Sequence, residues 1–275
     1  MKNFKLLTII AAMIITLVSC GPKKAQKTLV LYYSQTSNTK LVADEIANRL
    51  NSDIEEIVAV NPYDGNFTET IERCLQERNE GVTPEIQPVK ADIASYDVIF
   101  IGYPIWFGTY APPVITFLKN VNLSGKKIVP FCTYGSGGLE SSVKDLREAQ
   151  PNAEVLDGYG VRAARLGAVP YEIDQYLKAN DFLEGEYVKL DEFPEQHPVN
   201  EEETAIFVAA TGEYPMMHAQ AKTVASREIP GGVEYFFIAE DMPREIRDDM
   251  PPAGELQVYV TVIGEETPVF TKVVR

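Results

Sequence analysis

Residues 34–39 form a polar segment whose side chains are suited to binding an anion. Ser34-Gln35-Thr36-Ser37-Asn38-Thr39 follows an apolar run and precedes a stretch with helical spacing, and four of its six side chains carry hydroxyl groups. Free N–H groups and the positive end of the helix dipole would face a phosphate there. The alternative is an ordinary Ser/Thr-rich turn in which Asn38 caps the helix. No Gly-x-x-x-x-Gly-Lys pattern occurs, so a nucleoside triphosphate with magnesium is not indicated.

Two further segments have residue types that suit a flat organic ring. Residues 103–113 are rich in aromatic side chains and contain Trp106, the only tryptophan of the chain. Aromatic faces stack on a flat ring and exclude water from it. The alternative is that Trp106 fills the edge of the core. Residues 133–138 contain three glycines, which allow close approach of the backbone to a ligand or simply a tight turn.

The elements around these segments alternate between apolar strands and amphipathic helices. The spacing predicts strands over residues 28–33, 54–60, 98–102, 128–133 and 154–161, and helices over residues 40–50, 68–80, 113–119, 139–149 and 169–178. This pattern predicts an α/β fold, a doubly wound five-stranded parallel sheet with helices on both faces. Ligands bind beyond the carboxyl ends of such strands, and the three segments above follow the first, third and fourth strands.

The first segment and the strand before it resemble a known family signature. Residues 31–39, Leu-Tyr-Tyr-Ser-Gln-Thr-Ser-Asn-Thr, are similar to the flavodoxin pattern of an apolar, aromatic strand followed by Ser/Thr-x-Thr-x-Asn-Thr. The resemblance covers residues 28–180 and implies FMN as the cofactor. It implies that the phosphate is held by the side chains of Ser34, Thr36, Asn38 and Thr39 and by backbone amides of Gln35 and Ser37.

The resemblance also assigns the ring-binding residues. It implies that the second segment covers the isoalloxazine ring, with Trp106 as the stacking residue and Tyr110 or Phe107 contributing. A peptide next to Gly108 would turn to meet a protonated flavin N5. It further implies that the third segment contacts the pyrimidine edge, mostly through backbone groups. The remaining expected contacts are Pro104, Ile105, Thr133, Tyr134, Gly135 and Gly137.

The N-terminus has the features of an export signal. Lys2 and Lys5 precede an apolar run over residues 6–18, which is short for a membrane span. The following Leu17-Val18-Ser19-Cys20-Gly21 resembles the bacterial lipobox, which implies cleavage after Ser19 and lipidation of Cys20. The protein is then expected outside the cytoplasm on a bacterial membrane, with the periplasmic face of the outer membrane favoured. The alternative is an uncleaved anchor with an incidental cysteine.

Four regions follow from these patterns: a signal peptide (1–19), a lipidated cysteine and tether (20–27), the flavodoxin-like domain (28–185) and a small β-rich domain of unknown role (186–275). Turns at 230–232 and 251–254 separate β-forming runs over residues 205–209, 233–239, 256–263 and 269–274. An acidic linker is expected over residues 191–203.

The amino-acid composition limits the kinds of molecule that the protein is expected to bind. The formal net charge is -15, and loss of Lys2 and Lys5 with the signal makes the mature chain more negative still. Nucleic acid is therefore not expected, because phosphate backbones require basic surfaces, whereas a basic-surfaced redox partner protein is. The three cysteines match neither a disulfide framework nor a zinc site, and Cys132 is expected to be a buried thiol.

The expected function is electron transfer by bound FMN. Because the acidic protein disfavours additional negative charge on the ring, a low potential for the second electron is predicted. One alternative is an FMN-dependent NAD(P)H or quinone oxidoreductase. Another is a non-catalytic anchored scaffold or binding protein that carries the β-rich domain.

Overall fold

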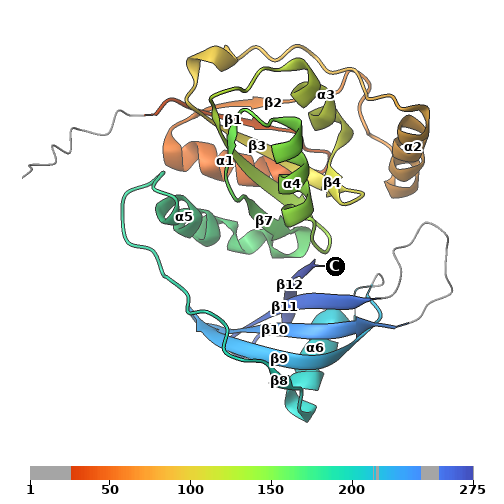
Figure 1. Ribbon diagram of the computed structural model, residues 1–275, viewed down its shortest axis with the longest axis vertical. Helices are drawn as coiled ribbons and strands as arrows, with labels where there is room; N and C mark the ends of the chain where they lie inside the picture. Colours follow the sequence, from red (N-terminus) through yellow and green to blue (C-terminus); the bar gives the residue numbers. More distant parts are fainter. Residues whose placement is uncertain (1–25, 213, 215–216, 243–253, 275) are drawn as a thin grey trace, which may run out of the picture.

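The computed structural model describes residues 26–212, 214, 217–242 and 254–274, so the predicted signal peptide and Cys20 lie outside the described residues. These residues build two sheets that lie one above the other (Figure 1). We call residues 26–179, around the parallel sheet, the first domain. Residues 197–274, around the antiparallel sheet, are called the C-terminal domain.

The first domain contains the predicted doubly wound parallel sheet. Its strands follow the order β2-β1-β3-β5-β6, β7 continues beside β5 after β6, and the short β4 folds back on β3. The chain therefore moves from β1 to one side and then to the other, which places a switch point between β1 and β3. The bounds are β1 (Thr28–Tyr32), β2 (Asp53–Glu56), β3 (Val98–Trp106), β4 (Thr109–Tyr110), β5 (Lys127–Tyr134), β6 (Glu154–Val155) and β7 (Tyr159–Arg162).

The strands are continuous apolar runs because both faces of this sheet are covered. Along β1, Leu29 and Leu31 enter the core on one face, whereas Val30 and Tyr32 enter the core on the other. The helices are α1 (Asn38–Leu50), α2 (Phe67–Glu80), α3 (Pro112–Asn120), α4 (Leu139–Ala149) and α5 (Val169–Ala179), with short 3₁₀ turns η1 (Ile93–Ser95) and η2 (Ala163–Ala168). Helices α1 and α5 share one core, and α2, α3 and α4 contribute to the other (Figure 1).

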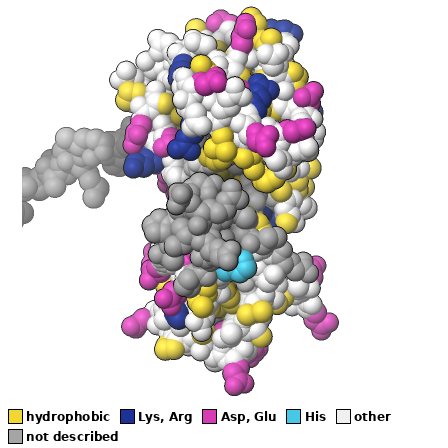
Figure 2. Space-filling view, turned by 90° about the vertical axis from the view of Figure 1, so that its right-hand side faces the viewer, with side chains coloured by type: hydrophobic (Ala, Val, Ile, Leu, Met, Phe, Trp, Pro, Cys, Tyr) yellow, Lys and Arg dark blue, Asp and Glu magenta, His cyan; other side chains and the backbone are white. Residues whose placement is uncertain are grey.

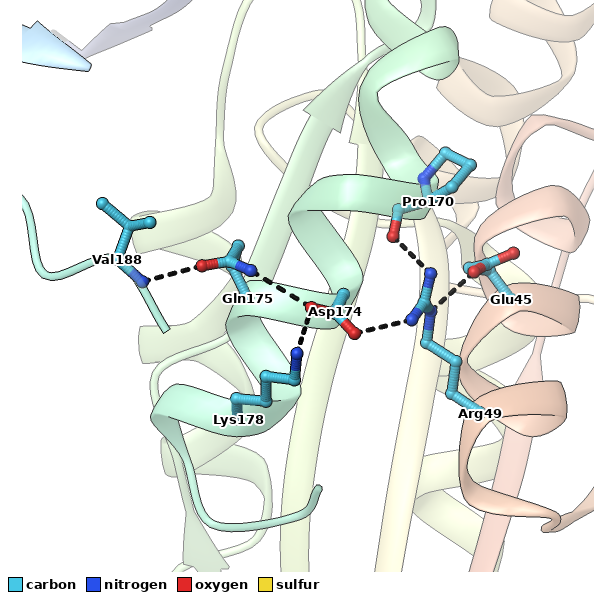
Figure 3. A network of polar contacts seen from close by, with 7 residues as sticks. All are labelled: Glu45, Arg49, Pro170, Asp174, Gln175, Lys178 and Val188. Atoms are coloured by element: carbon cyan, nitrogen blue, oxygen red, sulfur yellow. Dashed lines mark hydrogen bonds and ion pairs between the residues drawn. The ribbon is translucent and has the colours of Figure 1, made fainter. Parts of the chain in front are cut away.

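A polar network joins α1 to α5 (Figure 3). The guanidinium of Arg49 forms ion pairs with Glu45 at 2.6 Å and Asp174 at 2.7 Å, and it donates to the carbonyl of Pro170. Asp174 also pairs with Lys178 at 2.8 Å. Gln175 extends the network by accepting a hydrogen bond from the backbone N–H of Val188, so the segment after α5 is held against that helix.

The C-terminal domain packs one helix on an antiparallel sheet of order β12-β11-β10-β9-β8. Its elements are β8 (His197–Pro198), α6 (Glu201–Thr211), β9 (Ala219–Ile229), β10 (Gly232–Asp241), β11 (Glu255–Ile263) and β12 (Val269–Val274). Phe207 of α6 meets Phe237 of β10 edge-on at 5.2 Å between ring centroids, in a core completed by residues such as Val258 and Phe270.

Several predicted boundaries are wrong. Residues 205–209 belong to helix α6 instead of a strand, because Asn200 and Glu203 form a reciprocal capping box that starts the helix inside the expected acidic linker. The expected strand 154–161 is interrupted between β6 and β7. Strand β3 continues past the expected end at Gly102 to Trp106, because its last residues pair with β4.

Cys74 and Cys132 are free, buried thiols in the core of the first domain. The interpretation of Cys132 as a buried thiol is confirmed. No helix within the described ranges is long and apolar enough to cross a membrane.

Candidate functional site

The three predicted segments meet at the carboxyl edge of the parallel sheet. Thr39 of the first segment and Thr133 of the third are joined by a buried hydrogen bond of 2.8 Å between their hydroxyls. Ser141 of α4 donates to the carbonyl of Gly108 in the second segment at 2.6 Å. In the view of Figure 2, hydrophobic side chains gather along the border of the first domain that faces the C-terminal domain.

The first segment is arranged as an anion-binding loop. Helix α1 begins at Asn38, and Ser37 precedes it with a φ of 64° and no side-chain cap. The expected alternative, Asn38 as a capping residue, is therefore not what the structure shows. The backbone N–H of Lys40 donates to Ser34 Oγ, and that of Leu41 donates to the carbonyl of Ser37. The N–H groups of residues 34–39 have no acceptor among the described residues. The first turn carries no acidic side chain, so the donor set fits a phosphate dianion.

Two side chains of this segment hold the loop in place. Gln35 donates to the carbonyl of Tyr63 at 2.8 Å and to the hydroxyl of Thr70 at 3.0 Å. Thr39 is buried against Thr133, as described above. The hydroxyls of Thr36 and Ser37 are exposed and free to reach a ligand, and Ser34 Oγ accepts from the Lys40 N–H but keeps its own proton for donation. Gln35 and Thr39 offer only their backbone amides without rearrangement.

The second segment is a tight β hairpin formed by β3 and β4. Phe107 and Gly108 lie at its tip with φ values of 52° and 80°, which is the type I′ geometry of two-residue hairpins. A positive φ is an outlier for a bulky residue such as phenylalanine and is found mainly where strain has a function. The Phe107 side chain is 51% exposed. The hairpin therefore presents an aromatic ring to solvent from a strained position.

The other aromatic residues of this segment occupy different environments. Trp106 is partly buried and meets Tyr33 and Tyr63 edge-on, at 5.8 and 5.2 Å between ring centroids. Tyr110 is buried and packs edge-on against Tyr103 at 5.6 Å, so its ring belongs to the core. Of the two candidates for assisting Trp106, only Phe107 is placed for contact with a ligand. Pro104 and Ile105 lie in the last part of β3 and are half-buried.

Tyr63 is a site residue that the sequence reasoning missed. It lies in the connection between β2 and α2, with the guanidinium of Arg73 3.7 Å from the centroid of its ring. Burial, together with the hydrogen bond from its hydroxyl to Glu77, raises the pKa of Tyr63 well above its usual value. The turn-forming residues that flank it, Pro62, Asp64 and Gly65, were the available signal for a loop at the same sheet edge.

The third segment connects β5 to α4 through its backbone. Tyr134 is buried and donates to the carbonyl of Gly160, so its ring is directed into the core instead of toward a ligand. Gly138 has a φ of 112° and lies so close to Ile105 that a Cβ would fall 2.7 Å from its side chain. Glycine is therefore needed where the second and third segments touch.

The C-terminal domain contacts this third segment, which the sequence did not reveal. The carbonyl of Ser136 accepts from the backbone N–H of Val273 at 2.7 Å. The carbonyl of Gly135 accepts at 2.8 Å from Nε of Arg162 in β7, whose guanidinium also donates to the carbonyl of Phe270 in the C-terminal domain. Lys272 forms an ion pair with Glu140 at 2.8 Å. Burial raises the pKa of Glu140, but its hydrogen bonds to Lys272 and to a backbone amide outweigh this and lower it overall.

Three known proteins are similar to parts of this chain. An uncharacterized protein of Methanocaldococcus jannaschii is 31% identical over 124 residues, which cover 44% of this chain and 64% of that protein. A flavoprotein from Bacteroides eggerthii is 30% identical over 54% of this chain and 96% of its own, with a TM-score of 0.47. A flavoprotein solved with FMN from Lactobacillus acidophilus is 28% identical over 55% of this chain and 98% of its own, with a TM-score of 0.46.

A family model supplies the assignment. The flavodoxin model matches residues 27–165, just over half of the chain, and this range contains all three loops of the candidate site. The chain therefore belongs to the flavodoxin family.

Proposed function

We propose that this chain is an FMN-binding electron-transfer protein held at a bacterial membrane, outside the cytoplasm, by a lipid on Cys20. The observation that carries the FMN site is that the uncapped start of α1 and the aromatic hairpin lie at the same sheet edge, where Trp106 of the hairpin contacts Tyr33 at the end of β1. The start of α1 provides hydrogen-bond donors for a phosphate, and the hairpin provides an apolar surface for a flat ring at the same edge of the sheet. Membership of the flavodoxin family supports FMN as the cofactor.

The residues of the chain divide into two groups around this cofactor. Amides of residues 35–39 and the hydroxyls of Ser34, Thr36 and Ser37 would hold the phosphate end. Trp106 and Phe107 would cover the ring and exclude water from it, and the third segment would meet its edge. Bound FMN supplies reversible one- and two-electron redox chemistry, and the protein supplies position and electrostatics.

Net charge supports a particular kind of redox partner. At -15, the chain attracts a basic-surfaced protein and repels other acidic ones. Slower electron transfer to such a partner at raised ionic strength is the signature of this attraction, and rates independent of salt would contradict it.

The first test is flavin binding by the chain from Gly21 onward. We expect flavin absorption bands that co-elute with the protein, and quenching of Trp106 fluorescence on addition of FMN. A colourless protein that ignores FMN would overturn the proposal and leave the scaffold alternative. Rapid oxidation of NAD(P)H by the yellow protein alone would favour the oxidoreductase alternative.

A substitution separates the phosphate end from the ring end. Thr36→Val removes an exposed hydroxyl from the first segment and is expected to weaken FMN binding about tenfold, the cost of one hydrogen bond to a charged group. Riboflavin lacks the phosphate, so its affinity should not change. Thr204→Val is the matched control, because Thr204 is also exposed and lies in the first turn of α6 in the C-terminal domain, where its hydroxyl donates, among the described residues, only to the carbonyl of Asn200. Equal losses for FMN and riboflavin would contradict the assignment of the first segment.

A further inference from the structure

The last strand of the C-terminal domain lies against the third segment of the FMN site. Strand β12 is at the edge of its sheet, next to the first domain (Figure 1). The backbone N–H of Val273 in β12 donates a hydrogen bond to the carbonyl of Ser136 in the first domain. Beside it, the ammonium of Lys272 pairs with Glu140 at the start of α4. The two domains are thus joined at the loop that is expected to meet the flavin.

Arg162, the last residue of β7, forms hydrogen bonds to both sides of this junction. Its guanidinium donates to Gly135 on one side and to the carbonyl of Phe270 in β12 on the other, at 2.8 and 2.7 Å. The same group lies 3.4 Å from the centroid of the Phe270 ring and 5.7 Å from that of Tyr214. The guanidinium of Arg162 therefore links the third segment to the C-terminal domain.

Gly137 shows how closely the strand approaches. A Cβ on this residue would lie 2.2 Å from the carbonyl oxygen of Val273, although its backbone conformation is open to other residues. The absence of a side chain at residue 137 is thus required by the C-terminal domain and not by the loop itself.

These contacts determine where two amide groups point. The carbonyls of Gly135 and Ser136 both face Arg162 and β12, because those are their hydrogen-bond donors. In a trans peptide the N–H is directed opposite to the carbonyl. The N–H of Ser136 therefore points away from Arg162 and the N–H of Gly137 away from β12, and no described residue accepts a hydrogen bond from either.

We propose that the C-terminal domain is a positioning part of the FMN site. Through Arg162 and β12 it fixes two peptide groups of the third segment, so that the N–H groups of Ser136 and Gly137 donate to the carbonyl oxygens at the pyrimidine edge of the flavin. This inference rests on the proposed function, because it assigns a role at the same site.

The test measures the affinities of FMN and riboflavin for Arg162→Gln and Gly137→Ala in the chain from Gly21 onward. Both variants release the third segment from β12, so each dissociation constant is expected to rise about tenfold, the cost of losing one or two oriented hydrogen bonds. FMN and riboflavin should be affected equally, because the loss is at the ring. In the parent chain, FMN should slow amide hydrogen exchange at Ser136 and Gly137, and this protection should be lost in both variants.

Two matched controls keep general destabilisation apart from the proposed effect. Arg227→Gln removes an arginine of β9, in the sheet that contains β12. Arg227 pairs with Glu234 and lies 4.2 Å from the centroid of the Phe193 ring, without touching the third segment. Gly167→Ala adds a Cβ that meets nothing within 4 Å. Both controls should bind flavin like the parent chain.

The outcomes separate this proposal from the proposed function. If the parent chain binds neither flavin, the FMN site itself is wrong. If it binds FMN while folded Arg162→Gln and Gly137→Ala bind FMN and riboflavin unchanged, the C-terminal domain has no part in the site. A loss confined to FMN would place the effect at the phosphate and would also overturn the proposal. Should Arg162→Gln fail to fold, Gly137→Ala decides alone.

Discussion

At the scale of single residues, Phe107 combines features that folding alone does not favour. Its backbone has a positive φ, and the residue is 51% exposed to solvent. A left-handed conformation costs a non-glycine residue about 1–2 kcal/mol, and an exposed ring recovers little of this by burial. A ligand that covers the ring would recover more, which agrees with the place of the hairpin in the candidate site.

Phe107→Asn should therefore separate stability from binding. Asparagine tolerates positive φ, so the free energy of unfolding without flavin is expected to rise by about 1 kcal/mol in a denaturant titration. FMN affinity should fall, because the ring surface is lost. Phe67→Asn is the control, since Phe67 is 81% exposed but has no positive φ. The same stability gain at residue 67 would show that strain at Phe107 is not the cause.

The sequence predicted which loops form the candidate site but could not assign the direction of each side chain. Tyr110 was one of two candidates predicted to assist Trp106 at the ring, and its own ring lies in the core. Which face a strand residue occupies depends on register, and the register of β4 follows from the hairpin at Phe107 and Gly108. That turn is not visible in a pattern of aromatic residues alone.

At the scale of elements, helices with strong periodicity were predicted most accurately. Helix α4 has its expected bounds, and α1 begins two residues earlier than predicted. Helix α6 was mistaken for a strand because the short run at 205–209 is apolar and contains Ile206, Phe207 and Val208. The capping-box pair Asn200 and Glu203 was the signal that identifies it as a helix. The split of β6 from β7 has no such local signal.

The network between α1 and α5 makes stability depend on pH. A hydrogen bond from Lys178, with the charges of Lys178 and Arg49, holds the pKa of Asp174 below its usual range. A lowered pKa means that the stabilisation is present above the pKa of the unfolded chain, about 4, and is lost as the pH falls through the folded value.

Asp174→Asn is thus expected to reduce the free energy of unfolding by about 0.5–1 kcal/mol at pH 7, a modest value because the pair is partly exposed. The difference from the parent chain should vanish as the pH falls well below 4. Asp44→Asn removes a more exposed pair with Lys40 and should have little effect. A cost for Asp174→Asn that persists at low pH would show that the charge is not responsible.

At the scale of the whole molecule, the parallel fold and its switch point could be predicted, whereas the contact between the domains could not. Arg162 and Phe270, or Ser136 and Val273, are too far apart in sequence for any local pattern to connect them. The glycine at 137 was read as a property of a ligand loop, but its close neighbour is the C-terminal domain.

The proposed anchor is also a property of the whole molecule, and a single substitution tests it. Cys20→Ala removes the proposed acceptor of the lipid and should move the protein from the membrane fraction to the soluble fraction outside the cytoplasm. Radiolabelled palmitate should enter the parent chain and not the variant. Unchanged membrane association of Cys20→Ala would favour an uncleaved anchor. The distribution between fractions is measured by immunoblot, with Cys74→Ala as a control.

The contact between Ser136 and Val273 also has a consequence for the order of folding and cofactor binding. The two residues are separated by about half of the chain, and contacts of such long range are slow to form because closing a long loop costs chain entropy. The parallel sheet can pair from its own residues, but the third loop reaches its final position only after β12 has been synthesised and docked. A chain stalled before β12 would therefore carry a complete phosphate loop beside an unfinished ring pocket. Cofactor loading would then be among the last steps of its maturation.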